Sequence, residues 1–197
     1  SAAAAAHAAE ISESDLAAFE AAGQGASKIN FAALAPMLGL NPQKLAIIAS
    51  GWLPSPKDLN QWPEIRSFTT VGDSFTVNCY LIWDAATREA ALFDTDLDAS
   101  PALDVITAEG LVLRHIFITH SHWDHVEALP KFRAAFPEAQ LHSSSKKAPA
   151  NQRNKAGESV ALGQLQITHR ETPGHAEDGV TYLISGWPKN APQVAVV

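Results

Sequence analysis

The stretch 119–125 reads Thr-His-Ser-His-Trp-Asp-His and places four potential metal ligands close together in the chain. These ligands are His120, His122, Asp124 and His125. In an extended segment, side chains two positions apart point to the same side, so the imidazoles of His120 and His122 could aim at one ion. Asp124 and His125 follow where the chain begins to turn, which leaves them free to serve a second ion. The spacing therefore predicts a metal site.

A fifth potential ligand, His175, comes much later, in the sequence Thr-Pro-Gly-His. The Pro-Gly pair before it predicts a tight turn that would bring the imidazole to the end of a strand. Zinc in catalytic sites is bound by three protein ligands and keeps a fourth position for water, whose pKa falls to about 7. We expect His120, His122 and His175 to supply these three ligands. Asp124 would serve a second ion with His125, could orient the hydroxide, and is the predicted catalytic residue.

The ligand types leave the identity of the metal open. Histidine and aspartate suit zinc, iron and manganese alike. We expect one or two divalent ions, with zinc as the first choice and iron or manganese as alternatives. A net charge of −7 suits the retention of cations.

Composition narrows the classes of partner. The net charge of −7 and the pI near 5.5 argue against a general nucleic-acid binder. No apolar run approaches membrane-spanning length, and the segment 1–9 lacks the basic and apolar regions of a secretory signal. The single cysteine, Cys79, cannot form an internal disulfide and fits a reducing compartment. These features predict a cytoplasmic protein that acts on a small-molecule substrate and binds neither nucleic acid nor a membrane.

Other polar residues show weaker patterns. Asp94 and Asp96 end a predicted strand and could hydrogen-bond the ligating imidazoles, although solvated turn residues fit the pattern nearly as well. His115 lies within an apolar strand and is interpreted as a core histidine. His142 and His169 have no spacing that assigns them a role.

The loop after residue 142 carries several cationic side chains. They could contact an anionic substrate, but a solvated loop is the favoured interpretation. These residues are Lys146, Lys147, Arg153 and Lys155.

Cys79 lies on the apolar face of an early predicted strand and is interpreted as a small core residue.

The chain is expected to have three parts. In residues 1–55, Ala, Leu and Phe recur with helical spacing, and Asn41 with Pro42 is predicted to open the last helix. This helical extension carries no chemical motif and is interpreted as a packing or dimerisation element. Residues 56–66 contain prolines and predict an irregular connector. Residues 67–197 form the main domain.

Strands and helices interleave over this main domain, which predicts an α/β or α+β class with a mixed sheet. The buried strand 111–118 delivers the ligand cluster at its carboxyl end, where such folds expose their sites. The runs 75–83 and 89–93 predict a hairpin, and 143–157 a polar loop. The other predicted strands are 139–142, 159–162, 164–168, 180–185 and 193–197, and the predicted helices are 101–109 and 128–136.

The stretch 119–125 resembles the HxHxDH signature of the metallo-β-lactamase superfamily. The resemblance extends over about 67–197. Its supporting features are Asn-Cys-Tyr-Leu at 78–81, the strand end at Asp94 and Thr-Pro-Gly-His at 172–175. It implies the N-terminal half of an αββα sandwich with metals at one edge.

In that family, His120, His122 and His175 match the ligands of the first metal, while Asp124 and His125 match ligands of the second. The family continues past a strand like 193–197 into a Gly-Asp step, whose aspartate bridges both metals, and then to a later histidine. We therefore expect this chain to be part of a longer product. The remaining C-terminal half of the fold, or a homo-oligomer partner, would complete the site.

The sequence departs from the family pattern in two places. Val126-Glu127-Ala128 stands where the family often has small glycines, and Ala176 follows His175 where many glyoxalase-like members carry Thr or Ser.

The superfamily includes glyoxalase II-like thioester hydrolases, lactonases, β-lactamases, nucleases and mononuclear-iron sulfur dioxygenases, so the resemblance leaves the substrate open. The leading hypothesis is a metal-dependent hydrolase, in which a metal-activated hydroxide attacks an ester, thioester or lactone. One alternative is a sulfur dioxygenase-type oxidoreductase with a single iron that acts on a small thiol persulfide. Another is a non-catalytic, metal-stabilised binding module with residues 1–55 as its partner surface. A nuclease is disfavoured because the chain is acidic.

Overall fold

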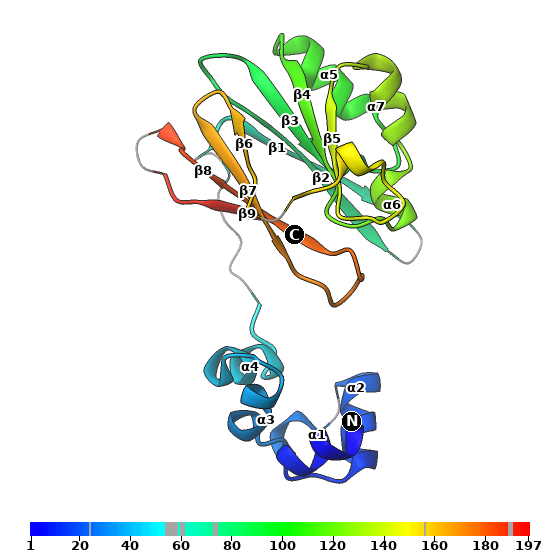
Figure 1. Cartoon of the computed structure of the whole chain (residues 1–197), viewed down its shortest axis with the longest axis vertical. Coiled ribbons are helices and arrows are strands. Elements are labelled where there is room, and N and C mark those ends of the chain that lie inside the picture. Colours follow the sequence, from blue (N-terminus) through cyan, green and yellow to red (C-terminus); the bar gives the residue numbers. More distant parts are fainter. Residues whose placement is uncertain (24, 54–58, 60–61, 73–74, 156, 189–190) are drawn as a thin grey trace. The chain divides into compact units, whose positions relative to one another are not determined.

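The structure, a computed structural model of the chain, describes residues 1–23, 25–53, 59, 62–72, 75–155, 157–188 and 191–197. It divides into two compact units, Ser1–Lys57 and Asp58–Val197 (Figure 1). Each unit has a hydrophobic core of its own. Of the connector predicted over 56–66, residues 56–58 and 60–61 lie outside the described residues, and Ile65 and Arg66 belong to the first strand of the second unit rather than to a connector.

The first unit consists of short helices. They are α1 (Ala2–Ala8), α2 (Glu13–Ala22), the 3-10 helix η1 (Ala26–Lys28), α3 (Phe31–Met37) and α4 (Pro42–Ala49). The side chain of Asn30 accepts a backbone hydrogen bond in the first turn of α3, and Asn41 does the same for α4. Pro42 occupies the first turn of α4, as the sequence predicted. The small core consists of Ala9, Ile29 and Leu34.

The second unit begins with a mixed five-stranded sheet. Its strands are β1 (Ile65–Val71), β2 (Thr76–Trp83), β3 (Glu89–Phe93), β4 (Val112–Phe117) and β5 (Gln140–His142), in the order β1-β2-β3-β4-β5. β1, β2 and β3 pair antiparallel, whereas β3, β4 and β5 pair parallel. The helices of this part are α5 (Ser100–Ala108), α6 (Trp123–Val126) and α7 (Leu129–Ala135).

A second sheet of four antiparallel strands follows. It is formed by β6 (Ser159–Leu162), β7 (Leu165–Glu171), β8 (Val180–Ser185) and β9 (Val194–Val196), in chain order. The connection from β7 to β8 carries His175, which places this histidine at one end of the second sheet.

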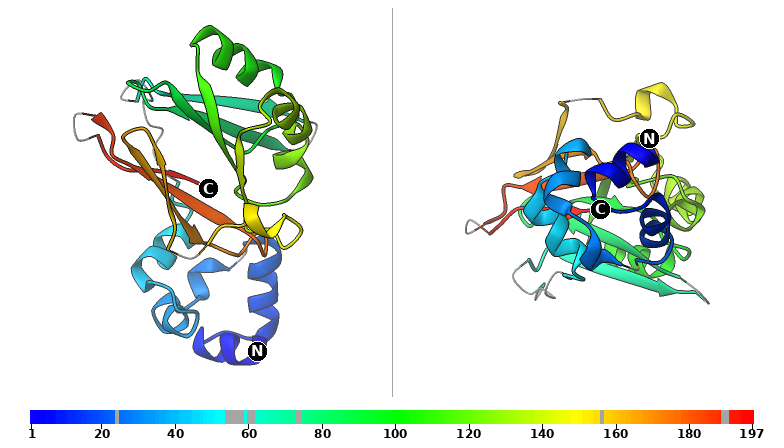
Figure 2. Two further views of the ribbon diagram at one scale, coloured as in Figure 1. Left: turned by 45° about the horizontal axis from the view of Figure 1, so that its top comes forward. Right: turned by 90° about the horizontal axis from the view of Figure 1, so that it is seen from below.

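Two apolar layers hold the second unit together. Figure 2 shows the backbone around them, with helices on one side of the five-stranded sheet and the four-stranded sheet on the other. The first lies between the five-stranded sheet and helices α5 and α7, and it includes Ile116, Phe132 and the predicted core residue Cys79. The second lies between the two sheets, where Phe93 stacks on Phe117 with ring centroids 5.0 Å apart. Because neighbouring residues of a strand face opposite sides, Ile116 and Phe117 of β4 enter different layers. The result is a helix layer followed by two facing sheets, as expected for part of an αββα sandwich.

Some elements differ from the sequence predictions. β1 was not predicted as a separate strand, because only Ile65 of its residues is buried and the alternation of apolar side chains is weak. The polar loop predicted over 143–157 contains a 3-10 turn, η3 (Ala150–Gln152), and a bridge between Ser143 and Arg153. Among the described residues, no helix combines the length and the apolar character needed to cross a membrane.

Candidate metal centre

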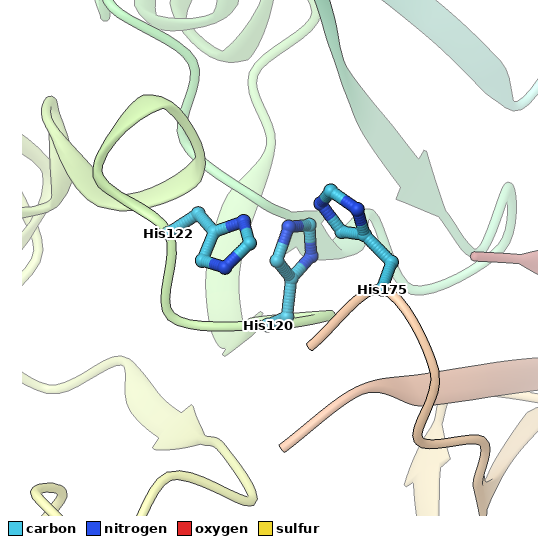
Figure 3. Close-up of side chains that lie close together, drawn as sticks. All are labelled: His120, His122 and His175. Carbon is cyan, nitrogen blue, oxygen red and sulfur yellow. The ribbon is translucent and has the colours of Figure 1, made fainter. Parts of the chain in front are cut away.

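Three imidazoles gather where β4 ends. His120 and His122 follow β4, and His175 lies between β7 and β8. Each ring offers one nitrogen such that the three nitrogen atoms all lie within 4.8 Å of one another. Figure 3 shows the three rings close together, reached from two separate segments of the chain. The structure thus brings together the residues predicted to bind the first metal.

The backbone explains why two of these rings share one side. His122 has an extended conformation, with φ −67° and ψ 150°, immediately before α6 begins at Trp123. Side chains at alternate positions of an extended segment point the same way. The ring centroids of His120 and His122 are accordingly 4.6 Å apart, and His175 lies 5.0 Å from the first and 4.7 Å from the second.

The hydrogen bonds of His120 determine which ring nitrogen is free. The hydroxyl of Thr119 has one hydrogen and donates it to Oδ2 of Asp94, which lies 2.7 Å away. The contact of 3.1 Å between this hydroxyl oxygen and Nδ1 of His120 therefore requires a hydrogen on Nδ1. Nε2 of His120 then carries a lone pair. It is buried and has no hydrogen-bond partner among the described residues.

A lone pair without a partner is costly in a buried position, and a metal ion would supply the missing partner. Burial, with the neighbouring His125, lowers the pKa of His120 and so favours the neutral imidazole that a metal requires. The donor atoms at this position therefore fit a bound divalent ion.

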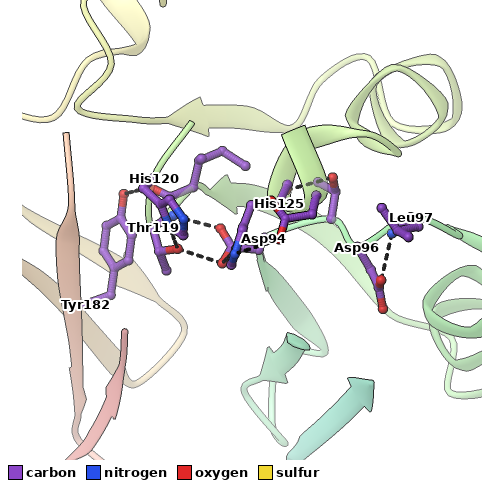
Figure 4. A network of polar contacts seen from close by, with 10 residues as sticks. Asp94, Asp96, Leu97, Thr119, His120, His125 and Tyr182 are labelled. Carbon is purple, nitrogen blue, oxygen red and sulfur yellow. Dashed lines mark hydrogen bonds and ion pairs between the residues drawn. The ribbon is translucent and has the colours of Figure 1, made fainter. Parts of the chain in front are cut away.

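Asp94 is a buried carboxylate that orients two of the rings (Figure 4). Its Oδ1 accepts the backbone N–H of Thr119 at 2.7 Å, and its Oδ2 lies 2.8 Å from Nδ1 of His125. Because a carboxylate only accepts, His125 carries a hydrogen on Nδ1, so in the neutral ring the lone pair is on Nε2. The predicted hydrogen bond between Asp94 and a candidate ligand is confirmed: Asp94 accepts directly from His125, and it accepts from Thr119, which in turn contacts His120. Asp94 has φ 58°, a conformation that is uncommon outside glycine and is often found at functional sites.

Asp96 has a different role. Its Oδ1 accepts the backbone N–H of Leu97 at 2.7 Å, and its carbonyl accepts the N–H of Ala128 at 3.1 Å. The described contacts include none between its carboxylate and an imidazole. Asp96 therefore stabilises the turn after β3 and ties it to the start of α7. It is buried, which excludes the solvated-turn interpretation, and its charge helps to raise the pKa of His125 although no described hydrogen bond joins the two.

Asp124 and His125 lie beside the three-imidazole group without belonging to it. Nε2 of His125 is 3.7 Å from Oδ2 of Asp124, and the His125 ring centroid is 4.0 Å from that of His120. Burial alone would lower the pKa of His125, but the hydrogen bond and charge of Asp94, with Asp124, raise it overall. The described residues contain no third ligand that would form a group with this pair.

Hydrogen bonds across the two sheets fix the ligand segments to each other. The backbone N–H of Val180 donates to the carbonyl of Thr119 at 2.8 Å, which joins the start of β8 to the loop after β4. The hydroxyl of Tyr182 donates to the carbonyl of Ile118 at 3.0 Å. The segment that carries His175 is thereby held next to the segment that carries the other histidines.

A second pair of histidines was missed by the sequence analysis. Nδ1 of His115 lies 3.0 Å from Nε2 of His142, and the His142 ring stacks on Phe117 with centroids 4.4 Å apart. Burial lowers the pKa of both residues, and that of His142 falls to about 4. His115 is thus a core histidine with a partner. Only the pairing of β4 with β5 reveals the contact, because the two residues are distant in sequence.

The cationic loop also has internal structure. The guanidinium of Arg153 donates to the backbone carbonyls of Ala148 at 2.8 Å and Lys146 at 2.6 Å. The Arg153 side chain therefore stabilises the loop that carries it, and these two N–H groups bind backbone carbonyls of the same loop.

Curated relatives match the second unit. A hydroxyacylglutathione hydrolase of Methylobacterium sp. (strain 4-46) is 37% identical over 124 residues, which are 61% of this chain and 47% of the relative. A hydroxyacylglutathione hydrolase of Nitrobacter hamburgensis is 33% identical over 123 residues, with the same shares of 61% and 47%. The chain spans about half the length of the curated relatives it matches.

Solved structures share the fold. The crystal structure of ETHE1 from Myxococcus xanthus is 32% identical, with a TM-score of 0.53 over 60% of this chain and 53% of that chain. MEM-A1, a subclass B3 metallo-beta-lactamase from a soil metagenome library, is 22% identical, with a TM-score of 0.52 over 67% of this chain and 58% of that chain. At 22% identity, the similarity to MEM-A1 shows only that the two chains share a fold. The family model described as the metallo-beta-lactamase superfamily matches residues 72–197, which include every candidate ligand. The chain therefore belongs to the metallo-beta-lactamase superfamily.

Proposed function

We propose that this chain forms the metal-binding part of a hydrolase that acts on an ester, a thioester or a lactone. The observation that carries the proposal is the convergence of His120, His122 and His175, with Nε2 of His120 buried, unpartnered and oriented by Thr119. The relatives named hydroxyacylglutathione hydrolase favour an acyl–sulfur bond within this class.

His120, His122 and His175 would hold one ion, for which zinc is the first choice. When bound, such an ion lowers the pKa of a water ligand to about 7, so that hydroxide is present at neutral pH. Asp124 has a partly exposed carboxylate beside His125 and would accept a hydrogen bond from the nucleophile, which orients it toward the acyl carbon. Asp94 would keep the His125 ring in the tautomer that leaves Nε2 free.

A second ion at Asp124 and His125 would need further ligands. We propose that these come from the C-terminal half of the fold or from a homo-oligomer partner. The substrate is proposed to be a small molecule, and the extension 1–55 a packing or dimerisation element.

A single-iron oxidoreductase of the sulfur dioxygenase type is the second candidate. It is favoured by the fact that the three imidazoles form a group that does not include Asp124 or His125, so one ion can be held without them.

The test combines metal analysis with turnover. The purified chain, and the chain with any C-terminal continuation of its reading frame, are assayed for bound zinc, iron and manganese and for hydrolysis of S-acyl glutathiones and acyl esters. We expect zinc binding, and thioester hydrolysis that is lost in His120→Ala and His122→Ala. His7→Ala, in the first unit, is the matched control and should change neither.

Other results would decide against the hydrolase. One iron per chain and oxygen uptake with a persulfide would support the oxidoreductase instead. Metal binding with no turnover of any of these substrates by the continued chain would support a binding module. Full metal content in His120→Ala would refute the ligand assignment.

A further inference from the structure

A polar cavity lies at one edge of the five-stranded sheet. Its volume is about 410 Å³, and it is lined by residues from the end of α7, from β5 and from the segment between η3 and β6. β5 is the last strand of its sheet (Figure 1), so one of its edges is left for other segments to flank. All five candidate metal ligands are described residues, and none of them lines this cavity. It is therefore a site separate from the candidate metal centre.

Hydrogen bonds fix the segment that faces β5 across the cavity. The backbone N–H of Ser143 donates to the carbonyl of Gln152 at 3.0 Å, and the N–H of Asn154 donates to the carbonyl of Ser143 at 2.9 Å. The side chain of Asn154 also donates to the hydroxyl of Tyr182 at 2.9 Å, which ties this segment to β8. Because the fold holds both sides of the cavity, a ligand would not have to order them, and binding costs less free energy.

Three cationic side chains line the cavity. They are Arg133, in the last turn of α7, and Arg153 and Lys155, which follow η3. Within the described parts of the chain, none of the three forms an ion pair, although Glu138 and Glu158 line the same cavity. Three cations against two carboxylates leave the cavity with one positive charge, in a chain whose net charge is −7. The cavity thus attracts anions although the chain as a whole is acidic.

Both arginines keep hydrogen-bond donors that the protein does not use. A guanidinium has five N–H groups. In Arg153, Nε donates to the carbonyl of Ala148 and Nη2 to that of Lys146, so three N–H groups have no partner among the described residues. In Arg133, the described contact is one bond from Nη1 to Oε1 of Gln152 at 3.3 Å. These oxygen atoms orient the guanidinium groups without neutralising them, so both charges are available to an anion.

This donor set favours a phosphate group over a carboxylate. A phosphate monoester carries up to two negative charges and three acceptor oxygens, and the planar donor pairs of arginine match it well. Pockets for small organic molecules measure about 300–1,000 Å³, so a cavity of about 410 Å³ has room for more than the phosphate. The amide and carboxylate side chains of the lining would hydrogen-bond hydroxyl groups on the rest of the ligand. They are Glu138, Gln140, Asn151, Gln152 and Glu158.

We propose that this cavity binds a sugar phosphate, with the phosphate at Arg133, Arg153 and Lys155 and the sugar hydroxyls at the amide and carboxylate side chains. The inference is independent of the proposed function, because no candidate metal ligand belongs to the cavity.

Four related compounds test the two parts of this ligand. Binding of glucose 6-phosphate, glucuronate, glucose and inorganic phosphate to the full chain is measured by calorimetry. Glucuronate carries a carboxylate where glucose 6-phosphate carries the phosphate, so the two compounds compare the anions on one skeleton. We expect glucose 6-phosphate to bind most tightly. Because phosphates also bind metal ions, each titration is run with zinc and repeated with a chelator, and the affinity should be the same in both.

Variants locate the binding. Arg133→Gln and Lys155→Gln change exposed side chains, and each should weaken glucose 6-phosphate about tenfold, the usual effect of losing a hydrogen bond to a charged group. Lys131→Gln is the matched control: it removes the same charge from α7 at an exposed position that does not line the cavity. Its affinity should equal that of the wild-type chain.

Several results would overturn the proposal. Glucose 6-phosphate would fail to bind at millimolar concentration, would bind only without the chelator, or would bind Arg133→Gln and Lys155→Gln as tightly as Lys131→Gln. Equal or tighter binding of glucuronate would refute the phosphate assignment, and equal or tighter binding of inorganic phosphate would refute the role of the sugar. None of these results would affect the metal centre, whose own test is zinc uptake.

Discussion

At the scale of single residues, Asp94 shows that a metal site depends on more than its ligands. One buried carboxylate accepts hydrogen bonds from Thr119 and from His125, and Thr119 in turn contacts His120. Each of these contacts assigns a hydrogen to Nδ1, so in the neutral ring Nε2 keeps the lone pair. The same residue adopts an uncommon backbone conformation at the end of β3, with φ 58°.

Replacing Asp94 by Asn tests this role with little change in shape. Asparagine tolerates a positive φ, so the backbone at the end of β3 should be retained. Half of the amide is a donor, however, and it can no longer accept from both Thr119 and His125. We expect zinc affinity to fall about 10- to 100-fold, the usual effect of removing a residue that orients a metal ligand. The measurement is competition with a chelating dye.

Asp104→Asn provides the control, because it makes the same chemical change at an exposed position in α5. Its zinc affinity should equal that of the wild-type chain. Equal affinities of Asp94→Asn and Asp104→Asn would show that Asp94 does not position the ligands.

At the scale of elements, the sequence predicted those helices and strands whose formation depends on interactions between residues close together in the chain. The hairpin of β2 and β3 and the cap of α4 follow from alternation, turn residues and Asn41 with Pro42, all short-range signals. β1 gave little signal because most of its side chains are exposed. Two members of the metal-ligand group, His120 and His122, were predictable because they are only two positions apart in sequence, and His175 because it follows a Pro-Gly pair. The separate roles of Asp94 and Asp96 were not, since they depend on what each carboxylate meets across the fold.

The contact between β4 and β5 gives a second example of a non-local feature. His115 and His142 share one hydrogen bond, in which one ring nitrogen donates and the other accepts, so the bond is lost when both rings are protonated. Burial lowers the pKa of His142 to about 4, and the charges of His115 and His169 add to the effect. Burial also lowers the pKa of His115, where Glu89 opposes the shift and Arg114 adds to it.

This pair predicts a loss of stability in acid. The ordinary pKa of histidine is 6.5, and that of His142 in the folded chain is about 4. Above pH 6.5 both states are neutral, and the stabilisation is complete. As the pH falls from 6.5 toward 4, the unfolded chain binds a proton that the folded chain does not, so the free energy of unfolding decreases. Urea unfolding of the metal-free chain between pH 7.5 and 4.5 measures this decrease.

His142→Phe keeps an aromatic ring against Phe117 but removes the titrating group. Over the same pH range, we expect the free energy of unfolding of His142→Phe to decrease less than that of the wild-type chain or of the His7→Ala control. An identical decrease in all three would mean that other groups account for the acid sensitivity.

At the scale of the whole molecule, all candidate ligands lie in the unit Asp58–Val197. The superfamily model covers most of this unit and leaves the helices of the first unit outside its match. The dimerisation or packing role of that extension and the cytoplasmic location stay predictions. Metal binding should therefore change the stability of the second unit first.

Zinc is expected to stabilise the second unit by mass action. At a free concentration of 100 times its dissociation constant, a ligand that binds only the folded state adds about 2.7 kcal/mol to the free energy of unfolding. For a unit of this size, that raises the midpoint temperature of unfolding by roughly 5–10 °C. Of the five tryptophans, only Trp52 lies in the first unit, so fluorescence of a Trp52→Phe chain reports on the second unit alone. In that background zinc should raise the midpoint, and a chelator should reverse the shift. His122→Ala should abolish it and His7→Ala should preserve it. A shift of equal size in His122→Ala would place the stabilising ion elsewhere in the chain.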